Sequence, residues 1–127
     1  MAFTWQTIEA LGAAYFIQQG YSVLVPFGDS NYYDFIVEKD GDFKRVNVKK
    51  AHLDRCTCWR ISLPRMRHGG TAMEHPEVDC YLAYLADLQL FIELGGDFFI
   101  GAKSKTKVIP KAIVDAWRDQ QATKEQD

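Results

Sequence analysis

Cysteine is scarce in this sequence, and its three copies are an odd number that cannot all pair within one chain. At least one cysteine must therefore stay unpaired within the chain, and reduced thiols fit an intracellular setting. Cys56, Cys58 and Cys80 match no common zinc-binding spacing when they are combined with the histidines nearby. Cys56 and Cys58 fit a strand better, so a structural zinc site is disfavoured.

Long apolar runs are also missing. No stretch approaches the roughly 20 residues that a membrane-spanning helix needs, and residues 1–5 lack the basic start and apolar core of a signal peptide. We therefore expect a cytoplasmic protein that makes no membrane contact. With 127 residues, 47% of them hydrophobic and 13% aromatic, the chain is long enough for one domain with a real core. We place that domain at residues 1–119 and a flexible tail at residues 120–127.

The chain has no overall excess of positive charge, since its net charge is −2. The basic residues are nevertheless concentrated: residues 42–70 carry eight Lys and Arg against Asp42 and Asp54. Such a cluster is typical of contact with a phosphate backbone, and the alternative is a solvated strand and loop. Residues 103–107 add alternating lysines, which could instead only solubilise an edge strand. The candidate DNA-binding residues are Arg55, Arg60, Arg65, Arg67, His68, Lys103, Lys105 and Lys107.

The order of the expected elements indicates an α/β or α+β fold, in which a mixed central β-sheet is flanked by helices. Thr4 or Thr7 can cap the first helix and Gly20 can end it. Residues 64–76 are expected to be an exposed loop. The predicted helices are residues 4–19 and 110–118, and the predicted strands are residues 21–25, 32–38, 43–49, 57–63, 78–86, 88–94 and 98–100.

A β-hairpin is the most specific local prediction. Asp40-Gly41 separates two arms rich in β-branched and aromatic residues, which is a strong hairpin signal. This turn places Asp34 opposite Asn47 on one face of the hairpin, and strand alternation adds Lys49 to that face. The opposite face is a plausible core surface that carries Phe35, Val37, Val46 and Val48.

A carboxylate, an amide and a lysine on one face fit a metal-dependent phosphodiesterase. Mg²⁺ prefers hard oxygen ligands, so Asp34 is the expected anchor and the backbone carbonyl of Val48 can supply a second oxygen. Lys49 can orient the attacking water or stabilise the pentavalent phosphate, and the amide oxygen of Asn47 is a weaker ligand. Glu9 is the only acidic residue of the first helix. The helix sequence by itself favours a surface position for Glu9 over a carboxylate aimed at a site.

The chain resembles the PD-(D/E)XK nuclease superfamily, and within it the short homing endonucleases encoded by cyanobacterial group I introns. In that family the pattern is a helix Glu, Gly-Tyr, Pro-x-Gly-Asp, Tyr-Asp and Val-Gln-Val-Lys. The stretches that carry the resemblance are Glu9-Ala10, Gly20-Tyr21, Val25-Pro26-Phe27-Gly28-Asp29, Tyr33-Asp34-Phe35-Ile36-Val37 and Arg45-Val46-Asn47-Val48-Lys49.

The resemblance implies a restriction endonuclease-like core in which Asp34 and Glu9 bind the metal and Lys49 is catalytic. Asn47 stands where the family has Glu or Gln, and it is the one departure from the pattern. The implied activity is that of a site-specific, Mg²⁺-dependent endonuclease, with Mn²⁺ as a substitute, acting on double-stranded DNA in a prokaryotic or phage-like context. Cutting both strands with one small site needs two copies, so a homodimer or homotetramer is expected.

Two alternatives to the homing type remain open. One is a Holliday junction resolvase or repair nuclease on the same fold. The other is a DNA-binding module on a weakened nuclease scaffold, which Asn47 suggests, since a fold alone does not fix function.

Overall fold

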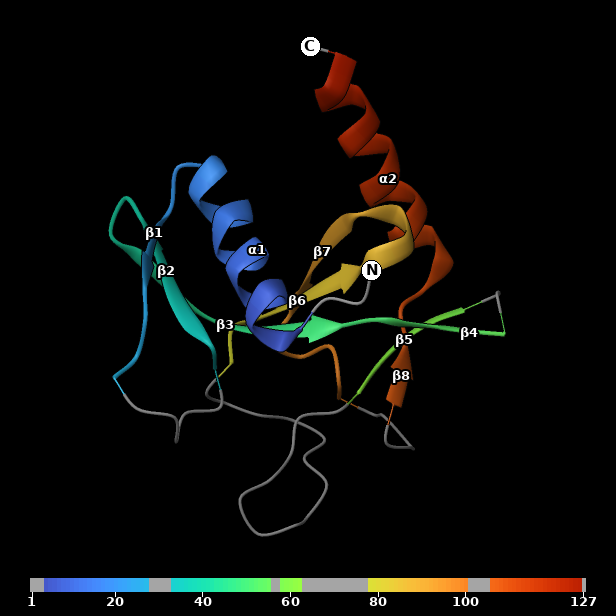
Figure 1. Ribbon diagram of the computed structural model, residues 1–127, viewed down its shortest axis with the longest axis horizontal. Coiled ribbons are helices and arrows are strands. Elements are labelled where there is room, and N and C mark those ends of the chain that lie inside the picture. The colour runs from blue at the N-terminus through green and yellow to red at the C-terminus, as the bar shows by residue number, and fades with distance from the viewer. Residues whose placement is uncertain (1–3, 28–32, 56–57, 63–77, 101–105, 127) are drawn as a thin grey trace, which may run out of the picture.

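The computed structural model describes residues 4–27, 33–55, 58–62, 78–100 and 106–126, with side chains up to Ala122 (Figure 1). The elements in chain order are α1 (Trp5–Gln18), β1 (Ser22–Leu24), β2 (Phe35–Lys39), β3 (Asp42–Lys50), β4 (His52–Asp54), β5 (Cys58–Ser62), β6 (Cys80–Leu85), the 3₁₀ helix η1 (Ala86–Leu88), β7 (Leu90–Gly95), β8 (Thr106–Val108) and α2 (Lys111–Gln126).

The main sheet has five strands in the order β1-β2-β3-β6-β7, and the smaller sheet has three in the order β4-β5-β8. The β3–β6 pair is parallel and the other pairs are antiparallel. The mixed α+β fold expected from the sequence is thus confirmed. None of the helices in the described ranges is long and apolar enough to cross a membrane.

The predicted hairpin register is confirmed. Phe35 pairs with Val46 and Lys39 with Asp42, so the turn consists of Asp40 and Gly41. Both turn residues have positive φ, 54° and 86°, as the tight turn favoured by Asp-Gly requires. Because side chains alternate along a strand, this register fixes which residues of β2 and β3 face the core.

One face of the main sheet packs against α1. The buried residues of this layer include Ile8 and Phe16 from the helix and all four apolar hairpin residues named above. Gly12 allows a close approach, since a Cβ there would lie 3.1 Å from Cδ2 of Leu82 and 3.3 Å from Cγ2 of Val48. A larger side chain would push α1 away from the sheet, together with everything the helix carries.

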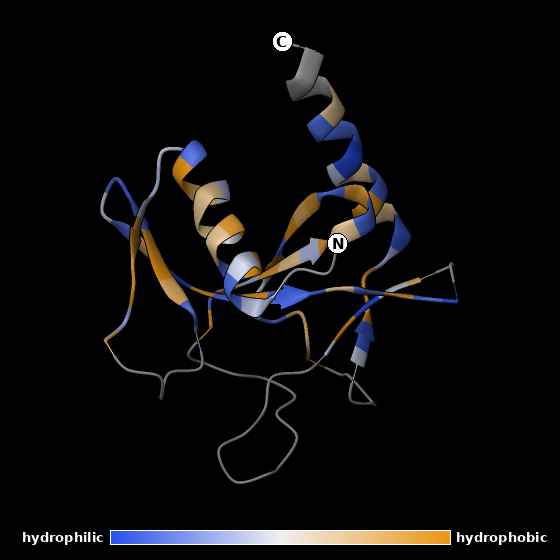
Figure 2. Cartoon of the chain, viewed as in Figure 1, coloured by the Kyte–Doolittle hydropathy of each residue, from blue (hydrophilic) through white to orange (hydrophobic). Residues whose placement is uncertain are grey.

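The opposite face packs against the smaller sheet and α2. Its buried cluster joins Tyr81 and Ile92 of the main sheet to Ile61 of β5 and Val114 of α2. Figure 2 shows apolar stretches on β2, β6 and β7, whereas α2 carries many hydrophilic residues. The main sheet is therefore covered on both sides, so its strands contribute core residues to two separate layers.

One predicted helix cap is confirmed, and several other predicted boundaries need correction. The hydroxyl of Thr4 accepts from the Thr7 N–H at 3.2 Å, so Thr4 caps α1. The predicted strand 98–100 is wrong, because residues 96–100 form turns in which Phe98 and Ile100 donate to carbonyls three residues back. Strand β4 was not predicted. The C-terminal helix continues to Gln126 instead of ending at Arg118, and the expected loop 64–76 lies outside the described residues.

Candidate active site

Asp34 lies at the end of the hairpin, one residue before β2. Its N–H donates to the carbonyl of Val46 at 2.8 Å, and its carboxylate oxygen Oδ2 accepts the N–H of Val48 at 2.6 Å. Strand β3 continues past the β2 ladder, so the Asp34 side chain satisfies a backbone group that the ladder does not reach. These two contacts fix the Asp34 carboxylate against β3.

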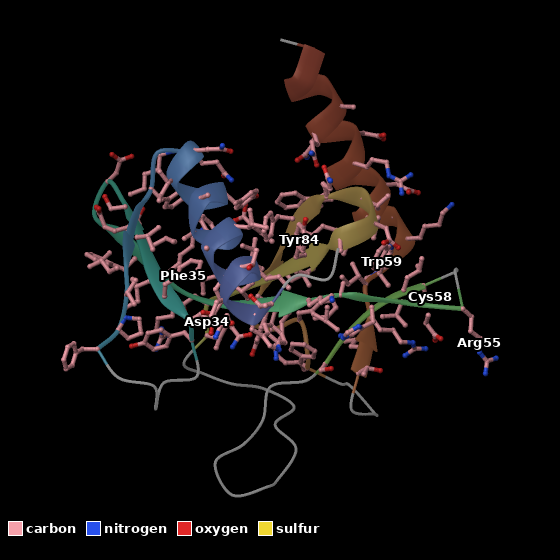
Figure 3. The ribbon with its side chains drawn as sticks, in the orientation of Figure 1. Asp34, Phe35, Arg55, Cys58, Trp59 and Tyr84 are labelled. Atoms are coloured by element: carbon pink, nitrogen blue, oxygen red, sulfur yellow. The ribbon has the colours of Figure 1, made fainter. Side chains whose placement is uncertain are left out.

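Glu9 reaches this carboxylate from α1. It follows Ile8, which is buried against the sheet, and its side chain forms a hydrogen bond with Asp34. In Figure 3 Asp34 lies near the N-terminal part of α1. The helix sequence favoured a surface position, whereas the structure places Glu9 beside Asp34, half-buried.

The two carboxyl groups perturb each other's pKa. Burial raises the pKa of Glu9 above its ordinary value, and the charge of Asp34 and the hydrogen bond to it raise it further. Burial also raises the pKa of Asp34, while the Val48 N–H, the Glu9 hydrogen bond and the Lys49 charge oppose that rise. Two adjacent carboxyls cannot both ionise at low cost without a cation.

Lys49 and Asn47 lie on the neighbouring strand. Asn47 is paired with Tyr81 and Lys49 with Ala83 across the parallel β3–β6 ladder. Both therefore face the layer that contains Tyr81, while Val48 and Lys50 alternate to the α1 face. Lys49 is near enough to Asp34 to stabilise its negative charge, and the amide oxygen of Asn47 is buried.

The donor set fits a magnesium ion. The described residues hold no group of three or more His, Cys, Asp and Glu that could bind a metal, so Glu9 and Asp34 stand as a pair. Mg²⁺ typically takes one or two carboxylates and keeps several waters. A pair of half-buried carboxylates fits this preference, and the Val48 carbonyl and the Asn47 amide on β3 are neutral oxygens that would complete the donor set.

The candidate DNA-binding residues within the described ranges differ in their exposure and in the contacts that they already make. Arg55 is exposed at the β4–β5 turn and points into solvent, well away from Asp34 (Figure 3). Arg60 forms an ion pair with Asp54 at 2.9 Å. The Lys107 ammonium donates to the carbonyls of Phe98 and Ile100. Outside the described ranges are Arg65, Arg67, His68, Lys103 and Lys105.

Tyr81 is a residue that sequence reasoning missed. It was assigned only to a buried strand, in which it lies two residues before Ala83. The signal that could have found it is a polar group at a core position, aligned with Asn47. A cavity of about 630 Å³ was also not foreseen; it lies between α1, β7 and α2, and Glu9 and Asp34 do not line it.

A family model described as PD-(D/E)XK endonuclease matches residues 6–123, so the chain belongs to the PD-(D/E)XK endonuclease family. The predicted resemblance and the expected DNA endonuclease are confirmed at the level of the family. Among solved structures, a bacterial homing endonuclease, I-Ssp6803I, is similar to this chain with a TM-score of 0.68 and 19% sequence identity. The similarity covers 94% of this chain and 93% of that one, and at this identity it demonstrates a shared fold. None of the curated proteins matches the chain.

Proposed function

We propose that this protein is a Mg²⁺-dependent endonuclease of the homing type, which cuts both strands of DNA at a specific site. The observation that carries the proposal is the hydrogen-bonded pair of Glu9 and Asp34 carboxyl groups beside Lys49. Carboxylates from a helix and from a hairpin end converge there from distant parts of the chain. Because the chain belongs to the PD-(D/E)XK endonuclease family, the reaction proposed for this pair is the cleavage of a phosphodiester bond.

Each residue has a separate task. Glu9 and Asp34 would hold the metal in their ionised form, and the hydrogen bond from the Val48 N–H keeps Asp34 in place. The metal, when bound, neutralises charge on the scissile phosphate and lowers the pKa of water. Lys49 orients that water or stabilises the phosphate transition state. Asn47 supplies a neutral amide oxygen at the position where the family has Glu or Gln.

Double-strand cleavage with so small a domain requires two copies of the site, so we propose a homodimer or a homotetramer as the active form. Double-stranded DNA is the proposed partner. The exposed Arg55, together with Arg65 and Arg67, supplies the positive charge that a phosphate backbone attracts.

The test is cleavage of a supercoiled plasmid that carries candidate target sites, with Mg²⁺ and with EDTA. The expected result is linear product only when Mg²⁺ is present, and none from Asp34→Asn. A four-way junction, compared with linear duplex, examines the resolvase alternative: preferential cleavage of the junction would replace the homing type. DNA binding with no cleavage in any divalent metal would favour the binding-module alternative.

A further inference from the structure

The hydroxyl of Tyr81 is a buried polar group whose presence the core does not explain. The side chain is 0% exposed, and the hydroxyl has no hydrogen-bond partner among the described residues. Its ring packs edge-to-face against Phe99, with centroids 4.9 Å apart. Phenylalanine would make the same ring contact without the cost of burying an unsatisfied hydroxyl. A buried polar group without a hydrogen-bond partner calls for an explanation, such as a functional role.

The residues paired with Tyr81 in the sheet identify the nearest candidate partner for its hydroxyl. On its own face of the sheet its paired neighbours are Leu94 on β7 and Asn47 on β3. The next residue of β6 on this face is Ala83, and the surrounding cluster is apolar. Of these paired positions, only Asn47 carries a polar side chain, and its amide oxygen is buried as well. Directly paired residues on one face have their Cβ atoms about 5 Å apart, so the two side chains start side by side, although the hydroxyl and the amide oxygen do not hydrogen-bond to each other in this structure.

The two groups are chemically complementary. Burial raises the pKa of Tyr81 to about 12, so its hydroxyl keeps its proton at any working pH. An amide oxygen has two lone pairs, so it can accept one hydrogen bond and still serve the site with the other. A residue that hydrogen-bonds to a metal-binding side chain commonly fixes the orientation of that side chain.

We propose that Tyr81 is a positioning residue of the nuclease site: its hydroxyl donates to the amide oxygen of Asn47, directly or through one water, when metal and DNA are bound. This inference rests on the proposed function, because it assigns Asn47 to the loaded site. The hydroxyl acts through Asn47 and touches neither substrate nor metal. Its unsatisfied state in the metal-free chain is a cost that loading removes.

The experiment compares Tyr81→Phe with Tyr84→Phe, a matched change on the same strand whose side chain packs in the α1 layer. Three quantities are measured: the free energy of unfolding in EDTA, DNA affinity in Ca²⁺, and single-turnover cleavage in Mg²⁺. For Tyr81→Phe we expect unfolding stability equal to or above wild type and unchanged DNA affinity. We expect cleavage to slow about tenfold, equivalent to about 1.4 kcal/mol. Tyr84→Phe should cleave at the wild-type rate.

A double-mutant cycle with Asn47→Ala separates positioning from general packing. In the Asn47→Ala background, Tyr81→Phe should cause little further loss of cleavage. The proposal is overturned if Tyr81→Phe cleaves at the wild-type rate, if its effect is the same in both backgrounds, or if it loses stability in EDTA.

Failure of the proposed function is a separate result. If the wild-type protein does not cleave, the coupling between Tyr81 and Asn47 is measured from the unfolding free energies of the same four proteins in Mg²⁺. A coupling within error of zero would then overturn the positioning role, and a coupling that appears only with Mg²⁺ would support it.

Discussion

At the scale of single residues, the assignment depends most on Asp34 and Lys49. Asp34→Asn removes the carboxylate charge while an amide oxygen can still accept the Val48 N–H. We expect cleavage to fall about 10³-fold, because the metal supplies several kcal/mol to the reaction, with DNA binding in Ca²⁺ retained. Lys49→Ala should reduce cleavage by about 10²–10⁴-fold, the usual contribution of a proton-transfer or charge-stabilising group.

Lys50→Ala is the matched control for Lys49→Ala. Lys50 is paired with Tyr84 and alternates to the α1 face, so its loss should affect cleavage much less. Gel-based cleavage assays on one substrate measure all three variants. Equal losses for Lys49→Ala and Lys50→Ala would show that the face assignment is mistaken, and full activity of Asp34→Asn would end the proposed metal site.

Glu9 links catalysis to pH-dependent stability. Its pKa is raised in the folded chain, so the metal-free native state binds more protons than the unfolded state just above pH 4.5. The sign follows: stability is lost as pH rises from the ordinary carboxyl range to the raised pKa. Glu9→Gln keeps a donor toward Asp34 and removes that proton. It should flatten this part of the stability profile in EDTA while abolishing Mg²⁺-dependent cleavage.

Denaturant unfolding in EDTA between pH 4 and pH 8 measures this prediction. Wild type should lose stability relative to Glu9→Gln as the pH rises through the raised pKa of Glu9. Added Mg²⁺ should restore wild-type stability at neutral pH and leave the variant unchanged. Parallel profiles for the two proteins would mean that the pKa of Glu9 is not raised in the folded chain.

Asn47 determines whether the site is weakened. Asn47→Gln restores the longer amide and Asn47→Glu restores a carboxylate. If Asn is a shortened ligand, both changes should raise Mg²⁺-dependent cleavage, by up to about tenfold for one better-placed oxygen, or about 1.4 kcal/mol. Single-turnover rates at saturating DNA measure the effect. No rise from an active starting protein would show that Asn is the native choice.

At the scale of elements, the parallel β3–β6 pairing is held at its start by Arg45 and Asp79. Asp79 accepts from the Arg45 backbone N–H at 2.8 Å and from its guanidinium at 3.0 and 3.2 Å. The Arg45 guanidinium keeps the pKa of Asp79 below its ordinary value. Through this ladder the clamp also sets Asn47 against Tyr81.

Asp79→Asn tests the clamp. The depressed pKa means that the stabilisation is present at neutral pH and is lost as the pH falls below 3.8. With both side chains about 40% exposed, the expected loss is about 1 kcal/mol or less at neutral pH. Asp115→Asn, which breaks the exposed Lys111–Asp115 pair, is the control and should have little effect. Equal losses in acid and at neutral pH would contradict the electrostatic origin.

At the scale of the whole molecule, the basic residues differ in what they can offer to DNA. Arg55 is exposed and should contribute by counterion release, so Arg55→Ala should reduce the slope of log K against log salt by about 0.9. The ammonium of Lys107 already binds two backbone carbonyls. Lys107→Ala should therefore lower the free energy of unfolding and leave the slope of log K against log salt nearly unchanged.

Fluorescence-anisotropy titrations over a range of salt concentrations measure both variants. An unchanged slope for Arg55→Ala would remove the β4–β5 turn from the DNA interface. A reduced slope for Lys107→Ala, with stability unchanged, would show that its carbonyl contacts are given up to phosphate.

The sequence by itself determined the hairpin and its register. Asp40-Gly41 specifies a tight turn, and the alternation of Phe35, Val37 and their partners allows one pairing that buries all of them. These are short-range effects, so Asp34, Asn47 and Lys49 could be grouped from the chain alone. The cap at Thr4 and the helix end before Gly20 were predictable for the same reason.

Only the tertiary structure decided which distant groups join them. Nothing in the α1 sequence directs Glu9 to Asp34; the close packing allowed by Gly12 does so. The parallel β3–β6 ladder that sets Tyr81 beside Asn47 joins strands separated by a long connection, and local preference says nothing about such a pairing. Phe98 and Phe99 favour a strand locally, yet they lie in turns, and Phe99 packs against Tyr81 across the core. Burial against residues that are distant in the sequence outweighs local strand propensity at such positions.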